Sequence, residues 1–375
     1  MSAAARRRPA RSPSRAILPA LALLVLTACS PEAAEPEPVF AGASAASAPV
    51  AGASAAVPPA LSYEGDAVSG LGLPWSIVVL DDGSLLVSER DTGEIRRINE
   101  TTREVIGTIA DATAAAGEGG LLGLAVANSA DPAVLYAYYT SAMDNRVVRL
   151  PLSDGGLGAP EPILTGIPKA DIHNGGRIAV GPDGHLYIGT GDAGVRPNAQ
   201  DPGNLGGKIL RITVDGDIPA DNPIPGSPVY SLGHRNVQGL AWDSAGALWA
   251  TEFGPEIDDE LNLVQPGGNY GWPEVTGAPG DSRFLDAQVV WPSTASSSPS
   301  GMTILDDIAY IGGLRGQRLW QVPLEGGTAG EPVSHFDGSY GRLRDVAGAG
   351  DGSLLVATNE SGGARILRIA VGLSG

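Results

Sequence analysis

Six copies of one short pattern constrain the fold more than any other feature of this sequence. Each copy begins with a turn signal, often Asp-Gly, and continues as a short run with alternating apolar side chains, as in a β-strand. The copies are DDGSLLVSER from Asp81, DPAVLYAYYT from Asp131, GPDGHLYIGTGD from Gly181, DSAGALWATEFG from Asp243, DDIAYIGGL from Asp306 and GDGSLLVATN from Gly350. They recur about 45 to 60 residues apart, in the range of a four-stranded propeller blade.

This repeat predicts an all-β fold, a six-bladed β-propeller with four-stranded antiparallel blades, over residues 61–375. Two packed β-sandwiches are the alternative, but no linker-like break divides the region. A propeller protects its strand edges by radial repetition and leaves a central channel. Loops at one end of that channel converge, so we expect the polar side chains of different blades to meet there.

The N-terminal segment, residues 1–28, has the pattern of a signal peptide. Five arginines precede the apolar run AILPALALLVL, which is shorter than a membrane span. The run ends in Leu-Thr-Ala-Cys, so we expect a bacterial lipoprotein that is cleaved before Cys29 and lipid-anchored through it; an ordinary signal peptide is the alternative. Residues 29–60 are rich in Ala, Pro and Ser and predict a flexible linker. We therefore expect an exported protein on the periplasmic or cell-surface face of a membrane.

The net charge and the cysteine content exclude some classes of function and of site. The formal net charge is −18, and such an acidic chain repels phosphate backbones, so nucleic-acid binding is not expected. Cys29 is the only cysteine, which excludes an intrachain disulfide and a thiolate metal site.

Polar clusters fall between the predicted strands. Several carry arginines, whose planar guanidinium groups suit carboxylates and phosphates, so these clusters indicate an anion site. The clusters are HNGGR from His173, TGD ending at Asp192, GHRN from Gly233, TEFGP from Thr251, DDELN from Asp258, GGNYGWP from Gly267 and RLRD from Arg342.

In this order the clusters resemble the soluble sugar dehydrogenases that depend on pyrroloquinoline quinone (PQQ), the glucose/sorbosone dehydrogenase family. The resemblance extends from about Leu71 to Arg368. It implies a six-bladed propeller that binds PQQ and Ca²⁺ and oxidises aldose sugars at the anomeric carbon to lactones.

The resemblance assigns catalytic roles to His173 and Asp192. His173 matches the general base that takes the proton of the anomeric hydroxyl while hydride passes to PQQ, a role that suits the histidine side chain near neutral pH. Asp192 matches the carboxylate that orients this histidine.

The resemblance also assigns cofactor contacts. Arg235 and Asn236 match residues that hold PQQ. Arg342 and Arg344 match an arginine pair that faces its carboxylates and quinone oxygens, and Arg315 falls where the family usually has lysine. PQQ carries three carboxylates, so several guanidinium groups suit its charge.

Calcium is implied at a third group of residues. The carbonyl groups of Gly254 and Pro255 match ligands of the calcium ion beside PQQ, and oxygen ligands suit this ion. Glu260 and Tyr270 match calcium-associated residues of the aldose dehydrogenase branch.

One residue departs from the family. The run GEGGLLG has Glu118 where a cofactor-contacting glutamine is usual. An ionised carboxylate donates no hydrogen bond and repels an anionic cofactor. Glu118 is therefore turned away, or binds an ion, or lowers the affinity for PQQ.

Two other functions remain open on the same fold: a calcium-dependent lactonase-like enzyme and a propeller that binds sugars or proteins without a cofactor. For the dehydrogenase, the expected partners are an aldose and an external electron acceptor, such as a small cytochrome or a quinone. The chain has no Cys-x-x-Cys-His haem motif of its own.

Overall fold

The computed structural model describes residues 58–112, 117–153 and 155–372. The predicted signal peptide, Cys29 and nearly all of the predicted linker lie outside these residues. No helix in the described part of the chain is long and apolar enough to cross a membrane.

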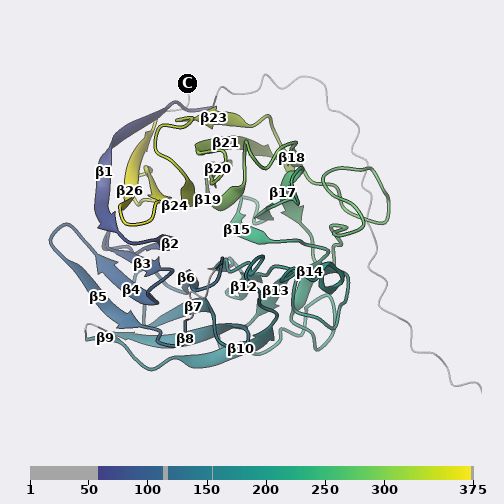
Figure 1. Ribbon diagram of the computed structural model, residues 1–375, viewed down its shortest axis with the longest axis horizontal. Coiled ribbons are helices and arrows are strands. Elements are labelled where there is room, and N and C mark those ends of the chain that lie inside the picture. The colour runs from purple at the N-terminus through teal and green to yellow at the C-terminus, as the bar shows by residue number, and fades with distance from the viewer. Residues whose placement is uncertain (1–57, 113–116, 154, 373–375) are drawn as a thin grey trace, which may run out of the picture. The chain divides into compact units, whose positions relative to one another are not determined.

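The strands form six antiparallel sheets, which confirms the predicted blades (Figure 1). Blade 1 contains β2 (Pro74–Val79), β3 (Leu85–Glu89), β4 (Glu94–Ile98) and β5 (Arg103–Thr108), and blade 2 contains β6 (Leu121–Val126), β7 (Val134–Thr140), β8 (Asn145–Ser153), β9 (Gly156–Leu157) and β10 (Glu161–Ile167). Blade 3 contains β11 (Ile178–Val180), β12 (Leu186–Gly189), β13 (Lys208–Ile212) and β14 (Val229–Leu232), and a short 3-10 helix, η1 (Arg196–Ala199), follows β12.

The other three blades complete the set. Blade 4 contains β15 (Val237–Trp242), β16 (Leu248–Glu252), β17 (Asp259–Val264) and β18 (Val289–Trp291). Blade 5 contains β19 (Pro299–Leu305), β20 (Ile308–Gly313), β21 (Arg318–Glu325), β22 (Thr328–Ala329) and β23 (Val333–His335). Blade 6 contains β24 (Leu343–Gly348), β25 (Leu354–Thr358), β26 (Ala364–Val371) and β1 (Leu61–Leu71), the first strand of the propeller.

The first strands of blades 1 to 6 line the centre and contact one another in a closed cycle: β2, β6, β11, β15, β19, β24 and again β2. The ring is completed by β1, which pairs antiparallel with β26, so Leu61 lies opposite Val371. Blade 6 is thus built from both ends of the propeller region.

The sequence repeat marks the second strand of every blade. In four copies an aspartate side chain accepts a hydrogen bond from a backbone N–H two residues further on, which stabilises the turn before the strand. These aspartates are Asp82, Asp183, Asp243 and Asp351. The strands that follow are buried on both faces, which explains why they read as short apolar runs.

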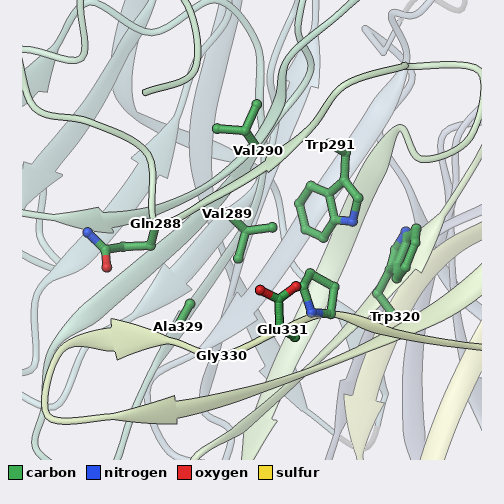
Figure 2. A pocket seen from close by; sticks show the side chains of 9 residues that line it. Gln288, Val289, Val290, Trp291, Trp320, Ala329, Gly330 and Glu331 are labelled. Atoms are coloured by element: carbon green, nitrogen blue, oxygen red, sulfur yellow. The ribbon is translucent and has the colours of Figure 1, made fainter. Parts of the chain in front are cut away.

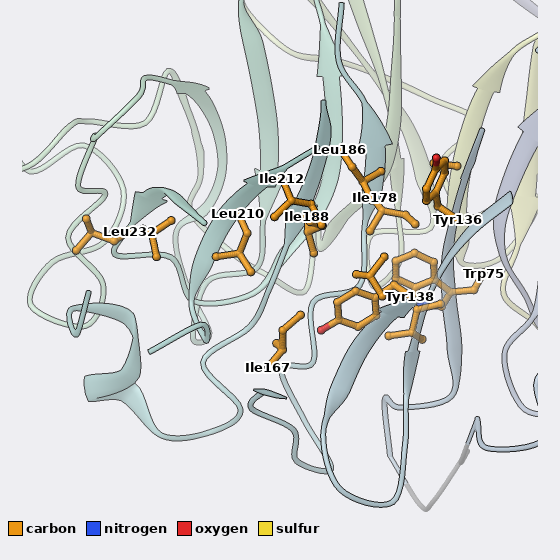
Figure 3. Packing of buried hydrophobic residues seen from close by; sticks show 14 residues of the cluster. Trp75, Tyr136, Tyr138, Ile167, Ile178, Leu186, Ile188, Leu210, Ile212 and Leu232 are labelled. Atoms are coloured by element: carbon orange, nitrogen blue, oxygen red, sulfur yellow. The ribbon is translucent and has the colours of Figure 1, made fainter. Parts of the chain in front are cut away.

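Apolar side chains fill the space between blades. One such cluster joins blades 1, 2 and 3 and includes Trp75, Tyr138 and Ile188, all almost fully buried (Figure 3). Truncation of a buried residue such as Ile188 to alanine costs about 2–5 kcal/mol. This packing fixes each blade against the next, and with it the loops at the channel.

The central channel is crossed by a buried polar network. Arg177, just before β11, reaches blade 6, where its Nη2 lies 3.1 Å from Asp345 Oδ1. Its Nε donates to the carbonyl of Gln238 in blade 4 at 2.9 Å. A Cβ added to Gly301 would lie 1.9 Å from Asp345 Oδ1, so the glycine makes room for this crossing. Opposite blades are thereby tied together beside the polar clusters.

Candidate active site

His173 and Asp192 form a hydrogen-bonded pair. His173 lies in the connection that leads into β11, and Asp192 follows β12, so the two flank the first hairpin of blade 3. The Nδ1 of His173 lies 2.7 Å from Oδ1 of Asp192. The side chain of His173 is 13% exposed and that of Asp192 is fully buried. The pair is therefore accessible only from the histidine side.

Glycines allow this close approach. The backbone N–H of Ala193 donates to the carbonyl of His173, and a Cβ at Gly191 would lie 1.9 Å from that same oxygen. Gly175 adopts a positive φ of 65° against the backbone of Thr190. The HNGGR and TGD motifs are thus two halves of one tightly packed contact.

The carboxylate of Asp192 is held by three donors. Besides His173, Oδ1 accepts the N–H of Gly194 at 2.7 Å, and Oδ2 accepts the indole N–H of Trp272 at 2.8 Å. Burial by itself raises the pKa of Asp192, but these hydrogen bonds outweigh it and leave the pKa below its ordinary value. Because the ionised carboxylate accepts from Nδ1, that nitrogen carries the proton, and Nε2 of His173 is the nitrogen that can accept one.

Arg235 and Asn236 lie beside this pair and carry buried donors without a partner in the described residues. Arg235 donates through Nη1 to the carbonyl of Phe253 at 3.0 Å, while its Nε is unpaired. Asn236 Oδ1 accepts the N–H of Gly175 at 2.9 Å, while its Nδ2 is unpaired. Burial lowers the pKa of Arg235, although the charges of Asp192 and Glu252 oppose this effect. Unpaired buried donors are costly, and an acceptor-rich anionic ligand would satisfy them.

Arg344 is buried among neutral partners. Its Nη1 donates to Gln238 Oε1 at 3.0 Å and to Ser300 Oγ at 3.3 Å, and its Nε donates to Asn359 Oδ1 at 3.3 Å. Burial lowers its pKa to about 9, with further lowering by Arg90 and other nearby arginines. A buried guanidinium group of this kind favours an anion nearby.

Arg342 and Arg315 extend the positive region. Burial lowers the pKa of the half-buried Arg342, and Arg315 and Arg90 add to this effect by charge repulsion. Arg315 is exposed and donates to Thr294 Oγ1 at 3.0 Å. Three of the four predicted arginines, Arg315, Arg342 and Arg344, therefore act on one another electrostatically, as expected for an anion site.

Glu118 is turned toward the histidine. Its Oε2 accepts the backbone N–H of His173 at 2.7 Å, and its own N–H donates to the carbonyl of Asp171 at 2.8 Å. Its charge also acts on Arg235, Arg342 and Arg344, where it opposes the lowering of their pKa values. The departure from the family thus introduces a carboxylate that bonds to the backbone of His173 and whose charge acts on Arg235, Arg342 and Arg344.

Three of the four predicted calcium residues lie together. Gly254, Pro255 and Glu260 line a cavity of about 10 Å³, together with Glu252 and Trp272. This volume holds about one small ion or water. Burial, and then the charge of Glu252, raises the pKa of Glu260 well above its ordinary value, so a cation beside the two carboxyl groups would favour ionisation.

Tyr270 is not part of this cavity lining. Its hydroxyl donates to the carbonyl of Leu263 at 2.6 Å and accepts the N–H of Gln265 at 2.9 Å. Its ring stacks on His234. In the described residues no cluster of three or more His, Cys, Asp or Glu side chains has the spacing of a metal site, so a cation here would depend on carbonyl oxygens and water as well as Glu260.

A wider cavity of about 500 Å³ lies between blades 4 and 5 (Figure 2). It is lined by β18 and by residues 329–332, with Trp291 and Trp320 side by side at 5.5 Å between ring centres. Neither His173 nor Asp192 lines it, so we assign the chemistry to the His173–Asp192 pair, on the basis of its titratable groups, and not to this cavity.

Four residues at the site were not singled out by their sequence: Arg90, Gln238, Glu252 and Trp272. Glu252 accepts hydrogen bonds from His234 and from the backbone N–H of Arg235. Its position in TEFGP, and that of Trp272 in NYGWP, were the available signals. Gln238 carried none, because its partner Arg344 comes from another blade, and Arg90 carried none, because its charge acts on Arg342 and Arg344 of blade 6.

Comparison with known proteins identifies the family of this chain. The profile of the family described as Glucose / Sorbosone dehydrogenase matches residues 71–368. Quinoprotein glucose dehydrogenase B of Acinetobacter calcoaceticus is 33% identical over 264 residues, covering 59% of this chain and 54% of that protein. Aldose sugar dehydrogenase YliI of Escherichia coli is 29% identical over 327 residues, covering 77% and 88%.

The structures agree as well. The PQQ-bound form of aldose sugar dehydrogenase from Streptomyces coelicolor is 46% identical and superposes with a TM-score of 0.81, covering 84% of this chain and 100% of that chain. The apo-form of the soluble aldose sugar dehydrogenase from Escherichia coli is 28% identical, with a TM-score of 0.76 and coverage of 83% and 100%. From its sequence, its six blades and its site, this chain belongs to the glucose/sorbosone dehydrogenase family.

Proposed function

We propose that this protein is a PQQ- and calcium-dependent dehydrogenase that oxidises aldose sugars at the anomeric carbon to lactones. The observation that carries the proposal is the His173–Asp192 pair beside the partly unpaired donors of Arg235 and Asn236. The names of the relatives support PQQ and sugar, since they include a quinoprotein glucose dehydrogenase and a PQQ-bound aldose sugar dehydrogenase.

In this proposal the protein residues position the sugar and move its proton. Nε2 of His173 accepts the proton of the anomeric hydroxyl, and the ionised Asp192 stabilises the resulting imidazolium. Arg235, Asn236 and Arg344 would hold carboxylate and quinone oxygens of the cofactor, and the more exposed Arg342 and Arg315 would add positive charge. PQQ, when bound, supplies the hydride acceptor.

Calcium would be held by the carbonyl groups of Gly254 and Pro255, with Glu260 alongside. When bound, the ion supplies a Lewis acid that polarises a quinone oxygen. The small cavity and the raised pKa of Glu260 support a cation at this position.

A propeller that binds sugars without a cofactor is the second candidate. Glu118 favours it, because a carboxylate that faces the arginines competes with an anionic cofactor for their charge. A lactonase-like activity would instead use acidic and amide ligands around a channel ion, and the arginine cluster does not favour it.

The predictions on export, lipid attachment and the electron acceptor are supported by the sequence motifs alone. We propose export, lipid attachment through Cys29, and electron transfer to an external cytochrome or quinone. Mass spectrometry of the mature N-terminus tests the attachment: a diacylated Cys29 supports it, and an unmodified residue elsewhere contradicts it.

The test of the activity adds PQQ and Ca²⁺, separately and together, to purified apo-protein and follows dye reduction with a panel of aldoses. Reduction that requires both additions and a sugar supports the proposal. PQQ spectra that stay unchanged on mixing, with no reduction, contradict it and favour the cofactor-free candidate.

A further inference from the structure

Trp272 is bonded to the orienting carboxylate rather than to the histidine. Its indole N–H donates to Asp192 Oδ2 at 2.8 Å, and both side chains are buried. Oδ1 of Asp192 has two donors, His173 and Gly194, whereas Oδ2 has only this indole among the described residues. The orientation of the carboxylate therefore depends on Trp272.

Two arginines lie against the indole ring, and backbone hydrogen bonds hold the residue. The guanidinium carbons of Arg196 and Arg235 lie 5.2 and 5.5 Å from its ring centre. Its backbone N–H donates to the carbonyl of Gly233 at 2.9 Å, and its carbonyl accepts Gln200 Nε2 at 2.8 Å. Cation–π contacts and backbone bonds together restrict the movement of the ring.

We propose that Trp272 is a positioning residue, which holds Asp192 in the orientation that presents Nε2 of His173 to the sugar. The proposal rests on the dehydrogenase function above, but the coupling between Trp272 and His173 can be measured without cofactor or turnover.

The direction of the effect follows from hydrogen bonding. An indole N–H donates and does not accept, so it favours the ionised carboxylate and lowers the affinity of the His173–Asp192 pair for its proton. Other charged groups also lie near the pair: Arg235 from the loop before β15, Glu118 at the backbone of His173, and Arg196 at the indole. These charged groups remain when only the indole N–H is removed, so a change in the proton affinity of the His173–Asp192 pair can be assigned to the loss of that bond.

The experiment replaces Trp272 by phenylalanine and, separately, by 3-benzothienylalanine, which keeps the shape and exchanges the N–H for sulfur. The matched control is Trp249→Phe, because Trp249 is also buried in blade 4 and donates to an aspartate, Asp243, at 2.9 Å. The control thus loses the same kind of bond away from the His173–Asp192 pair.

At saturating PQQ and Ca²⁺, we expect kcat of both Trp272 variants to fall about tenfold or more, while KM for the sugar stays within about threefold. The acidic limb of the pH–rate profile moves to higher pH. Trp249→Phe leaves kcat and the limb unchanged. A Trp272 variant that is folded and keeps both kcat and the pH profile overturns the proposal.

The coupling can be measured without turnover by following the imidazole of His173 by NMR in ¹⁵N-labelled apo-protein. The chain has only four histidines, which makes its signals easy to assign. We expect the titration midpoint of His173 to rise by about half a pH unit or more in the Trp272 variants and to stay in place in Trp249→Phe. An unchanged midpoint overturns the proposal. A raised midpoint in a protein that oxidises no sugar would confirm the coupling and contradict the proposed function instead.

Discussion

Two histidine–carboxylate pairs lie in neighbouring blades, and their difference shows what makes one of them reactive. His173 Nδ1 is 2.7 Å from Asp192, and His234 Nδ1 is 2.8 Å from Glu252. In His234 the second nitrogen also has a partner, Ser231 Oγ at 2.8 Å, and the ring is fully buried. His173 keeps its second nitrogen on the exposed side. The pair alone is therefore no sign of catalysis, and an available nitrogen is the distinguishing feature.

The comparison is tested most strongly by His173→Ala. We expect kcat to fall by about 10³-fold, because the proton acceptor is lost, while PQQ binding stays nearly unchanged. Activity with saturating cofactor and PQQ absorbance on titration measure the two effects. Activity within tenfold of wild type would show that His173 is not the base.

Asp192→Asn is expected to lower kcat by about 10²-fold or more, because an amide no longer selects the Nδ1–H tautomer. It also changes the pH dependence of stability. Since the pKa of Asp192 is lowered in the folded protein, its stabilisation is present above about pH 4 and is lost as the pH falls. The variant should lack this part of the acid dependence in denaturant titrations, and an identical profile would contradict the assignment.

His234→Phe is expected to have the opposite effect to His173→Ala: it lowers the stability of the protein and leaves its activity nearly unchanged. Phenylalanine keeps the stacking on Tyr270 but leaves Glu252 without its imidazole donor, at a cost of about 3 kcal/mol in unfolding free energy. At saturating cofactor, kcat should stay within about threefold. Unchanged urea unfolding together with a large loss of kcat would mean that the two pairs are not different in kind.

Glu118→Gln has the smallest expected effect. Glutamine can still accept the N–H of His173 through its amide oxygen, and it removes a negative charge near the arginines. We expect the Kd for PQQ to fall about three- to tenfold, measured by absorbance titration of apo-protein, with more change at low than at high ionic strength. A Kd that stays the same or rises would show that Glu118 does not limit binding.

The sequence predicted the six blades because the repeat carries a local cause, a turn followed by a buried strand, and in four of the six copies an aspartate side chain stabilises that turn. It also brought His173 and Asp192 together correctly, since one hairpin of blade 3 separates them. Trp272, Gln238 and Arg90 were not predicted as site residues. The contacts of Trp272 and Gln238 and the charge effect of Arg90 cross from one blade to another, and no local pattern marks a partner that distant in the chain.

The pairing of β1 with β26 has a consequence for how the site comes into being. Arg342 and Arg344 belong to blade 6, whose outer strand is the first one made and whose other strands are the last. Contacts between chain ends form slowly, because the loop they close is long. We therefore expect the arginines of blade 6 to reach their final position beside blades 1 and 5 only when the circle closes, so that a partly folded chain would offer an anionic ligand an incomplete site.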